Sequence, residues 1–229
     1  MGFGERRSRA SSFSRTAARR AARENQRVGN TSVMSEPRRI FILDGHPDGA
    51  RERFVHGLAE AYEEGAVSAG HQVLRKRLAD LDVPLLRSKD DYRGDPPEHL
   101  RECIDAMDWA QHVTILHPLW LGSMPAALKG LFEQLVRPGF AFSTNQLGRW
   151  PVRFWEGKTA RIIVTMGMSK LAYWWYYGVG AARSPQRVVL STSGFRSVHT
   201  TLIGRAETMS PEERKKWMEK VRALGRSGS

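Results

Sequence analysis

We predict an α/β domain built on a five-stranded parallel sheet, because short apolar runs alternate with amphipathic segments from residue 38 to the end of the chain. Runs of about four to eight apolar residues are typical of strands that helices cover on both faces. In such a sheet a ligand binds beyond the carboxyl ends of the strands, so we expect the loops after the first, third and fourth strands to carry the chemistry. The expected strands are Arg39–Asp44, His71–Arg77, His112–His117, Thr159–Met166 and Val198–Ile203.

Start and stop residues mark the helices between these strands. Ser123 is expected to cap the helix after the third strand, with Pro125 in its first turn. The stretch rich in Tyr and Trp after the fourth strand is expected to be a loop. The remaining expected helices are residues 51–69, ended by Gly70; a helix through Leu100, Ile104 and Met107; a short helix at Gln186–Leu190; and a last helix begun by the capping box of Ser210 and Glu213.

The first 33 residues differ in composition from the rest of the chain. They hold eight arginines against two glutamates, which is half of the net charge of +12, and are otherwise rich in Ser, Ala and Gly. Large apolar side chains are too few to offset the entropy of ordering, so we expect residues 1–35 to be a disordered Arg-rich extension and 36–229 to be one folded domain. Three interpretations of the extension stay open: a segment upstream of a natural start at Met34, an organelle-targeting peptide, or a basic arm for nucleic acid or anionic surfaces.

Several classes of protein are disfavoured by features that the sequence lacks. The single cysteine, Cys103, cannot form an internal disulfide or a cysteine-based metal cluster, which fits a reducing compartment. No apolar run approaches the roughly 18 residues needed to cross a bilayer, the histidines show no metal-ligand spacing, and the GxSxG motif of serine hydrolases is absent. We therefore expect a cytoplasmic protein without a metal site or membrane insertion; the alternative is delivery to an organelle through the Arg-rich N-terminus.

The loop after the first strand, GHPDGARERF, enters a helix at a place where backbone N–H groups favour a phosphate. It contains neither GxGxxG nor the P-loop pattern, so neither a Rossmann dinucleotide site nor a P-loop is predicted. His46 is a candidate anion contact, and the guanidinium of Arg51 or Arg53 is placed to grip a phosphate in bidentate fashion. The alternatives are turn packing for His46 and simple solvation for the arginines.

The loop after the third strand, HPLWLGSMPAALKG, is the most informative segment. Residues 118–121 place apolar side chains beside main-chain N–H and C=O groups, and Gly122 lets a flat ligand approach the backbone closely. That combination suits a flavin ring, which needs a stacking face and a hydrogen-bonding edge. The alternative is a hydrophobic elbow that seats the following helix.

The loop after the fourth strand, TMGMSKLAYWWYYG, combines Thr165 and Gly167 with a dense aromatic run. Such aromatic side chains are expected to wall a pocket for planar substrates and to form a dimer interface, and the alternative is core packing alone.

The segment HPLWLGSMPAALKGLFEQLVRPGFAF, residues 117–142, resembles the flavodoxin-like NAD(P)H quinone oxidoreductase family, which includes mammalian quinone reductase and bacterial modulators of drug activity. Weaker matches are GHPD after the first strand, TMGM at residues 165–168 and SGF at residues 193–195. The resemblance covers most of residues 38–225. It implies a three-layer fold with strand order 2-1-3-4-5, bound FMN or FAD, NADH or NADPH as co-substrate, and a homodimer. It also implies two-electron transfer to a quinone-like or other small acceptor.

The resemblance also implies roles for individual residues. Two departures from the family pattern stand beside those roles: the usual Ser-Phe-Asn phosphate contact is Arg53-Phe54-Val55 here, and no histidine follows Tyr173 where better-studied quinone reductases carry one for charge relay. The implied residues are Pro118, Leu119, Trp120 and Leu121 against the flavin, Thr165, Gly167 and Tyr173 on its other edge, and His46 at the phosphate. We expect Arg53 and Phe54 to complete the rearranged phosphate contact and Tyr173 to polarise the acceptor oxygen.

Two other functions are compatible with the same residues. A flavin-binding regulatory subunit of a transport protein would keep the flavin loops and turn over slowly with every quinone. A basic nucleic-acid-binding protein would depend on the arginine arm, and its affinity would fall steeply with salt. We expect no specific nucleic-acid partner.

Overall fold

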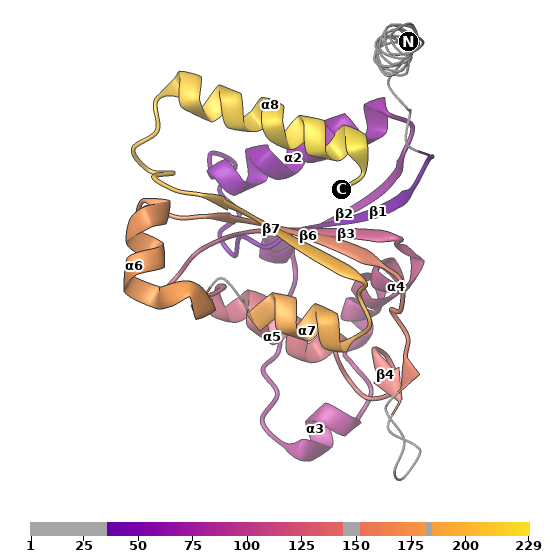
Figure 1. The fold of residues 1–229 in the computed structure, drawn as a ribbon. Helices are drawn as coiled ribbons and strands as arrows, with labels where there is room; N and C mark the ends of the chain where they lie inside the picture. Colours follow the sequence, from indigo (N-terminus) through magenta and orange to yellow (C-terminus); the bar gives the residue numbers. More distant parts are fainter. Residues whose placement is uncertain (1–35, 144–151, 182–184) are drawn as a thin grey trace, which may run out of the picture. The chain divides into compact units, whose positions relative to one another are not determined.

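The computed structural model describes residues 36–143, 152–181 and 185–229, and it contains the predicted five-stranded parallel sheet in the order β2-β1-β3-β6-β7 (Figure 1). Every neighbouring pair is parallel, and the order is the 2-1-3-4-5 arrangement. The second strand lies at an edge, as its charged residues predict. The strands are β1 Arg39–Asp44, β2 Gln72–Arg77, β3 His112–Pro118, β6 Thr159–Thr165 and β7 Ser197–Ile203.

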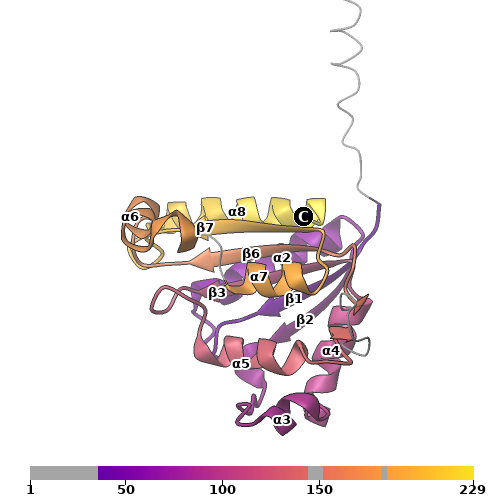
Figure 2. The same cartoon turned by 60° about the horizontal axis from the view of Figure 1, so that its bottom comes forward.

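Alternating side chains of each buried strand pack on opposite faces of the sheet. In β1, Ile40 and Ile42 belong to the core under one helix layer, and Phe41 and Leu43 to the core under the other. Figures 1 and 2 show α2 and α8 together on one face and α4, α5 and α7 on the other. These helices are α2 Phe54–Ser68, α4 Arg101–Trp109, α5 Ala126–Leu135, α7 Pro185–Thr192 and α8 Pro211–Ser227.

Helices α2 and α8 approach each other closely because each carries a glycine at the crossing point. A Cβ on Gly65 would lie 2.0 Å from the carbonyl oxygen of Arg222, and a Cβ on Gly225 would lie 2.0 Å from that of Tyr62. No side chain fits there, so the two backbones pack directly. This contact sets α8 beside α2 and places the start of α8 near the loop after β1.

Short elements join the layers. Buried Arg137, just after α5, donates from Nη1 to the carbonyl oxygens of Asp91, Gly94 and Asp95, and from Nη2 to Gln134. These bonds attach the excursion around α3 to the domain. The short elements are η1 Leu78–Asp80, α3 Lys89–Arg93, η2 Glu98–Leu100, and a two-stranded antiparallel pair of β4 Phe142–Ser143 and β5 Val152–Arg153.

Three local predictions are wrong. Helix α2 begins at Phe54 rather than near residue 51, because residues 50–53 form a turn closed by Arg53 N donating to Ala50 O at 3.1 Å. Ser123 does not cap α5; its N–H and C=O pair with Trp120 instead. The aromatic stretch is helix α6, Lys170–Ala181, rather than a loop. The capping box of Ser210 and Glu213 at α8 is confirmed.

The predicted Arg-rich extension, residues 1–35, lies outside the described residues, so its disorder and the domain boundary stay predictions. Within the described part of the chain, no helix is long and apolar enough to span a membrane.

We predict that the protein loses stability below pH 6.5 through two buried histidines. Burial, with the charges of Arg38 and Arg161, lowers the pKa of His112 to about 3, and burial lowers that of His117 to about 4. In the unfolded chain both titrate near about 6.5. Below that pH the unfolded chain binds the extra protons, so the free energy of unfolding falls as pH falls, by up to about 1.4 kcal/mol per pH unit for each histidine.

Urea denaturation between pH 7 and pH 4 measures this dependence. His112→Gln should reduce the slope of unfolding free energy against pH by about one proton. Val67→Thr, at an exposed side chain that binds no proton, is the control and should leave the slope unchanged. Equal slopes in the two variants would contradict the assignment.

Candidate functional site

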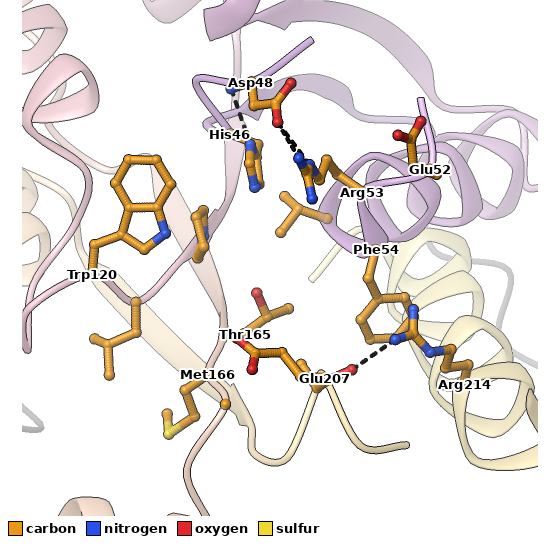
Figure 3. Close-up of a pocket in the computed structure, with 15 residues that line it drawn as sticks. His46, Asp48, Glu52, Arg53, Phe54, Trp120, Thr165, Met166, Glu207 and Arg214 are labelled. Atoms are coloured by element: carbon orange, nitrogen blue, oxygen red, sulfur yellow. Dashed lines mark hydrogen bonds and ion pairs between the residues drawn. The ribbon is translucent and has the colours of Figure 1, made fainter. Parts of the chain in front are cut away.

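A hollow of about 420 Å³ lies at the carboxyl-terminal edge of the sheet, where β1, β3, β6 and β7 end (Figure 3). This is the edge at which parallel α/β sheets bind ligands. Its walls come from the three predicted loops and, in addition, from the connection between β7 and α8. The lining residues are His46, Asp48, Glu52, Arg53, Phe54, Val55, Pro118, Leu119, Trp120, Thr165, Met166, Gly167, Ala206, Glu207 and Arg214.

Most of the predicted site residues meet in this hollow, although residues 46 and 165 are far apart in sequence. Leu121 and Tyr173 are not among the lining residues. Leu121 is fully exposed, and Tyr173 is buried in the first turn of α6. The predicted residues that line the hollow are His46, Arg53, Phe54, Pro118, Leu119, Trp120, Thr165 and Gly167.

A buried pair of side chains fixes the first loop. The Asp44 carboxylate ends β1 with only 1% exposure, and its Oδ2 lies 2.6 Å from His56 Nδ1. The other ring nitrogen, His56 Nε2, lies 2.8 Å from the carbonyl oxygen of Asp48, which can only accept. Both ring nitrogens of His56 thus face oxygen atoms of the first loop and of β1, and the ring ties the loop to α2.

His46 projects into the hollow as a neutral donor. Its Nδ1 accepts the backbone N–H of Asp48 at 3.1 Å, so the neutral ring carries its proton on Nε2. Burial, with the nearby His56, lowers the pKa of His46. The ring centroid lies 5.5 Å from that of His56 and 6.0 Å from that of Trp120, which it meets edge-on. Figure 3 shows this ring between Trp120 and Arg53.

The amino end of α2 faces the same hollow. No side chain caps it and its first turn contains no carboxylate, so its N–H groups keep their affinity for an anion. Arg53 precedes it, and Asp48 Oδ2 accepts from both its Nε, at 2.8 Å, and its Nη2. Asp48 thus holds the guanidinium at the mouth of the hollow. The hydrogen bond from Ala50 N, followed by the hydrogen bond and charge of Arg53, lowers the pKa of the Asp48 carboxyl.

The loop after β3 is a tight hairpin. Trp120 and Ser123 exchange both backbone hydrogen bonds at 2.9 Å, and Leu121 and Gly122 between them have φ of +47° and +78°. A positive φ at leucine is strained, and the turn directs this side chain into solvent. Leu119 N donates to Thr165 O at 2.7 Å. The N–H groups of Leu119 and Trp120 are therefore hydrogen-bonded within the fold.

The loop after β7 supplies lining residues that the sequence interpretation missed. Arg214, in the first turns of α8, places its guanidinium 5.0 Å from the centroid of the Phe54 ring and donates from Nη2 to Ala206 O at 2.9 Å. Glu207 lies between Thr165 and Arg214, with its carboxylate beside Thr165 (Figure 3). The predicted fifth strand ends at the same sheet edge, and this was the signal that could have identified the loop after it.

The hollow can therefore receive an elongated ligand with two different ends. Pro118, Leu119 and Trp120 form an apolar side that suits a flat ring. His46, Arg53, Arg214 and the start of α2 form a side that suits an anionic group. No three His, Cys, Asp or Glu side chains in the described segments are grouped to hold a metal ion.

Comparison with known proteins identifies the family of the fold. The model of a family described by a flavodoxin-like fold matches residues 38–225. An uncharacterized NAD(P)H oxidoreductase of Haemophilus influenzae is 27% identical over 109 residues, which are 46% of this chain and 54% of that protein. The matched part is thus about half of that relative's length.

Solved structures share the fold. An NAD(P)H:quinone oxidoreductase from Methanothermobacter marburgensis superimposes with a TM-score of 0.68 at 20% identity, over 83% of this chain and 96% of that one. An FMN-dependent NADH-azoreductase of Bacillus anthracis, solved in complex with FMN, gives 0.57 at 15% identity, over 81% and 96%.

We predict that His56→Ala destabilises the protein by about 3 to 5 kcal/mol, because it leaves the buried Asp44 carboxylate without its partner. The double variant Asp44→Asn/His56→Gln replaces both members of the pair with neutral amides and should recover part of that loss. Thermal and urea unfolding measure both. Lys215→Ala, at an exposed lysine of α8, should change stability by less than about 0.5 kcal/mol. A His56→Ala loss that small would show that the pair is not structural.

Proposed function

The chain belongs to this flavodoxin-like fold family, and on that premise we propose that it is a flavin-dependent NAD(P)H oxidoreductase that passes two electrons to a quinone-like or other small acceptor. The observation that carries the proposal is the hollow at the strand ends, where an apolar side for a flat ring adjoins a side for an anion. FMN and FAD each combine a planar ring with phosphate in this way. The names of the relatives add support for nicotinamide chemistry.

The residues of the hollow fit a flavin in detail. Pro118, Leu119 and Trp120 would hold the ring, and Thr165 and Gly167 would face its opposite edge. Neutral His46 would donate from Nε2 to the phosphate without the cost of a buried charge, together with the uncapped N–H groups of α2. Arg53 takes the place of the family's Ser-Phe-Asn contact, and a phosphate would share it with Asp48.

A bound flavin would supply the redox chemistry, taking a hydride from reduced nicotinamide and giving two electrons to the acceptor. The protein's part is to bind, orient and exclude water. Trp120 and Leu119 cover the ring site with apolar surface, which strengthens every hydrogen bond made there. Tyr173 is our candidate for polarising the acceptor oxygen, since a neutral phenol donates a hydrogen bond. Because Tyr173 is buried outside the lining of the hollow, that role requires α6 to shift when the acceptor binds.

We also propose a homodimer formed through α6. Leu171 and Trp175 lie one helical turn apart on α6, with 82% and 86% of their surface exposed, and Trp174 beside them is 51% exposed. Apolar side chains grouped in this way mark an interface. Sedimentation equilibrium at micromolar concentration tests the proposal directly: a monomer there would contradict it.

The function is tested by what the purified protein binds and whether that group is reduced. Heating the full-length chain should release FMN or FAD, and anaerobic NADH or NADPH should bleach the bound flavin. A quinone should then restore the colour at a rate that supports turnover. A colourless protein that refuses both flavins on reconstitution would overturn the proposal. Bound flavin with slow turnover on every quinone would favour a regulatory subunit instead.

We predict that Arg53→Ala weakens FMN binding roughly 10- to 100-fold, because a charge-assisted phosphate contact is lost. Riboflavin, which has no phosphate, should bind both forms equally. Arg51→Ala removes an exposed neighbouring charge outside the hollow and is the matched control. Equal weakening of FMN and riboflavin would show that Arg53 does not contact the phosphate.

A further inference from the structure

A second hollow, of about 400 Å³, carries a concentration of positive charge that the proposed function leaves unexplained. We call it the lysine pocket. Its cationic side chains are Lys170, Arg205, Lys216 and Lys220, and Trp217 lies among them half-buried. Glu213 is the one carboxylate in its lining; it already accepts from Ser210 N at 3.0 Å and lies 3.5 Å from Arg205.

The ammonium groups of the lysine pocket are held close together. Lys170 Nζ lies 5.1 Å and Lys220 Nζ 4.6 Å from the ring centroid of Trp217, so the two lie within about 10 Å of each other. That separation is about one Debye length at 0.1 M salt, so their charges act jointly on a ligand. Both ammonium groups stack on the indole ring. Their side chains are therefore already partly ordered, which reduces the entropy cost of binding an anion.

The backbone that carries these side chains is fixed. Arg205 N donates to Met168 O at 3.0 Å, which joins the loop after β7 to the loop before α6. A Cβ on Gly204 would lie 2.9 Å from Met168 O and 3.0 Å from Lys170 N, so only glycine permits the two loops to meet this closely. Figure 1 shows α6 and the start of α8 at the same end of the sheet.

The lysine pocket shares a wall with the first hollow. Ala206 N donates to Met166 O at 2.9 Å, and both residues line the first hollow. The neighbouring hydrogen bond joins Arg205 N to Met168 O, and Arg205 and the two residues after Met168, Ser169 and Lys170, line the lysine pocket. A ligand whose reactive ring lies in the first hollow can therefore extend across this wall and place a charged group among the lysines.

We propose that the lysine pocket binds a phosphate monoester, and that this group is the 2′-phosphate of NADPH. A phosphate monoester carries up to two negative charges, which matches a pocket with four cations and one engaged carboxylate. NADH has a hydroxyl at that position and gains nothing from the pocket. The chain therefore prefers NADPH to NADH. The assignment rests on the proposed function for its ligand, but phosphate binding itself can be measured without turnover.

Calorimetry on the flavin-loaded full-length protein separates the possibilities. The probes are 2′,5′-ADP and 5′-AMP, which differ only by the 2′-phosphate, with inorganic phosphate as competitor. The 2′,5′-ADP should bind at least about tenfold more tightly, and its affinity should fall with salt. Lys216→Ala/Lys220→Ala should remove that difference, and Lys215→Ala, an exposed lysine of the same helix outside the pocket, should keep it.

The ratio of kcat/KM for NADPH to that for NADH is the second measurement. It should fall about tenfold in Lys216→Ala/Lys220→Ala and stay constant in Lys215→Ala. Equal binding of the two probes, or their equal displacement by inorganic phosphate, would overturn the assignment. A protein that binds 2′,5′-ADP through these lysines but is reduced by neither nucleotide would instead refute the proposed function and leave the phosphate site standing.

Discussion

The buried pairing of Asp44 with His56 is the contact on which the geometry of the first hollow depends. It joins the end of β1 to α2 and, through His56 Nε2, to the carbonyl oxygen of Asp48. Asp48 in turn sets both His46, by donating to its Nδ1, and Arg53, by accepting from its guanidinium. One buried carboxylate thus determines the direction of a neutral donor, a cation and a helix amino end. Desolvating such a pair is costly, so its value lies in fixing this arrangement more than in net stability.

The two helix layers explain why this edge of the sheet is open to a ligand. Helices α2 and α8 lie backbone to backbone at Gly65 and Gly225, which anchors the carboxyl half of α8. Its amino half then brings Arg214 over Phe54, at the side of the hollow opposite the Trp120 hairpin. The anion-binding side of the site is consequently built from the loop after β1 and from α8, which are far apart in sequence. The apolar side comes from the single loop after β3.

Much of this could be predicted from the sequence, because buried parallel strands are nearly continuous apolar runs and their ends define the ligand edge. Predictions failed where a short sequence pattern is compatible with two local structures. Ser123 has the chemistry of a helix cap but closes a hairpin with Trp120. The aromatic run of α6 is continuous, without the apolar spacing by which an amphipathic helix is recognised. Arg214 and the Asp44–His56 pair were missed for another reason. Phe54 lies far from Arg214 along the chain, and Asp44 and His56 are separated by the whole first loop, so only the folded structure brings each pair together.

The distribution of charge between the two hollows bears on selectivity more than the net charge does. The first hollow has two guanidinium groups and three carboxylates, Asp48, Glu52 and Glu207, with Arg53 already paired. The first hollow therefore binds a phosphate mainly through directed N–H groups, because its net electrostatic attraction for an anion is weak. The lysine pocket has the opposite balance, with little directed geometry and a strong local field. A nucleotide that spans both hollows would be oriented by the first hollow and attracted by the charges of the lysine pocket. Salt screens the electrostatic field of the lysine pocket but not the buried hydrogen bonds of the first hollow. Ionic strength should therefore affect nucleotide selectivity far more than flavin retention.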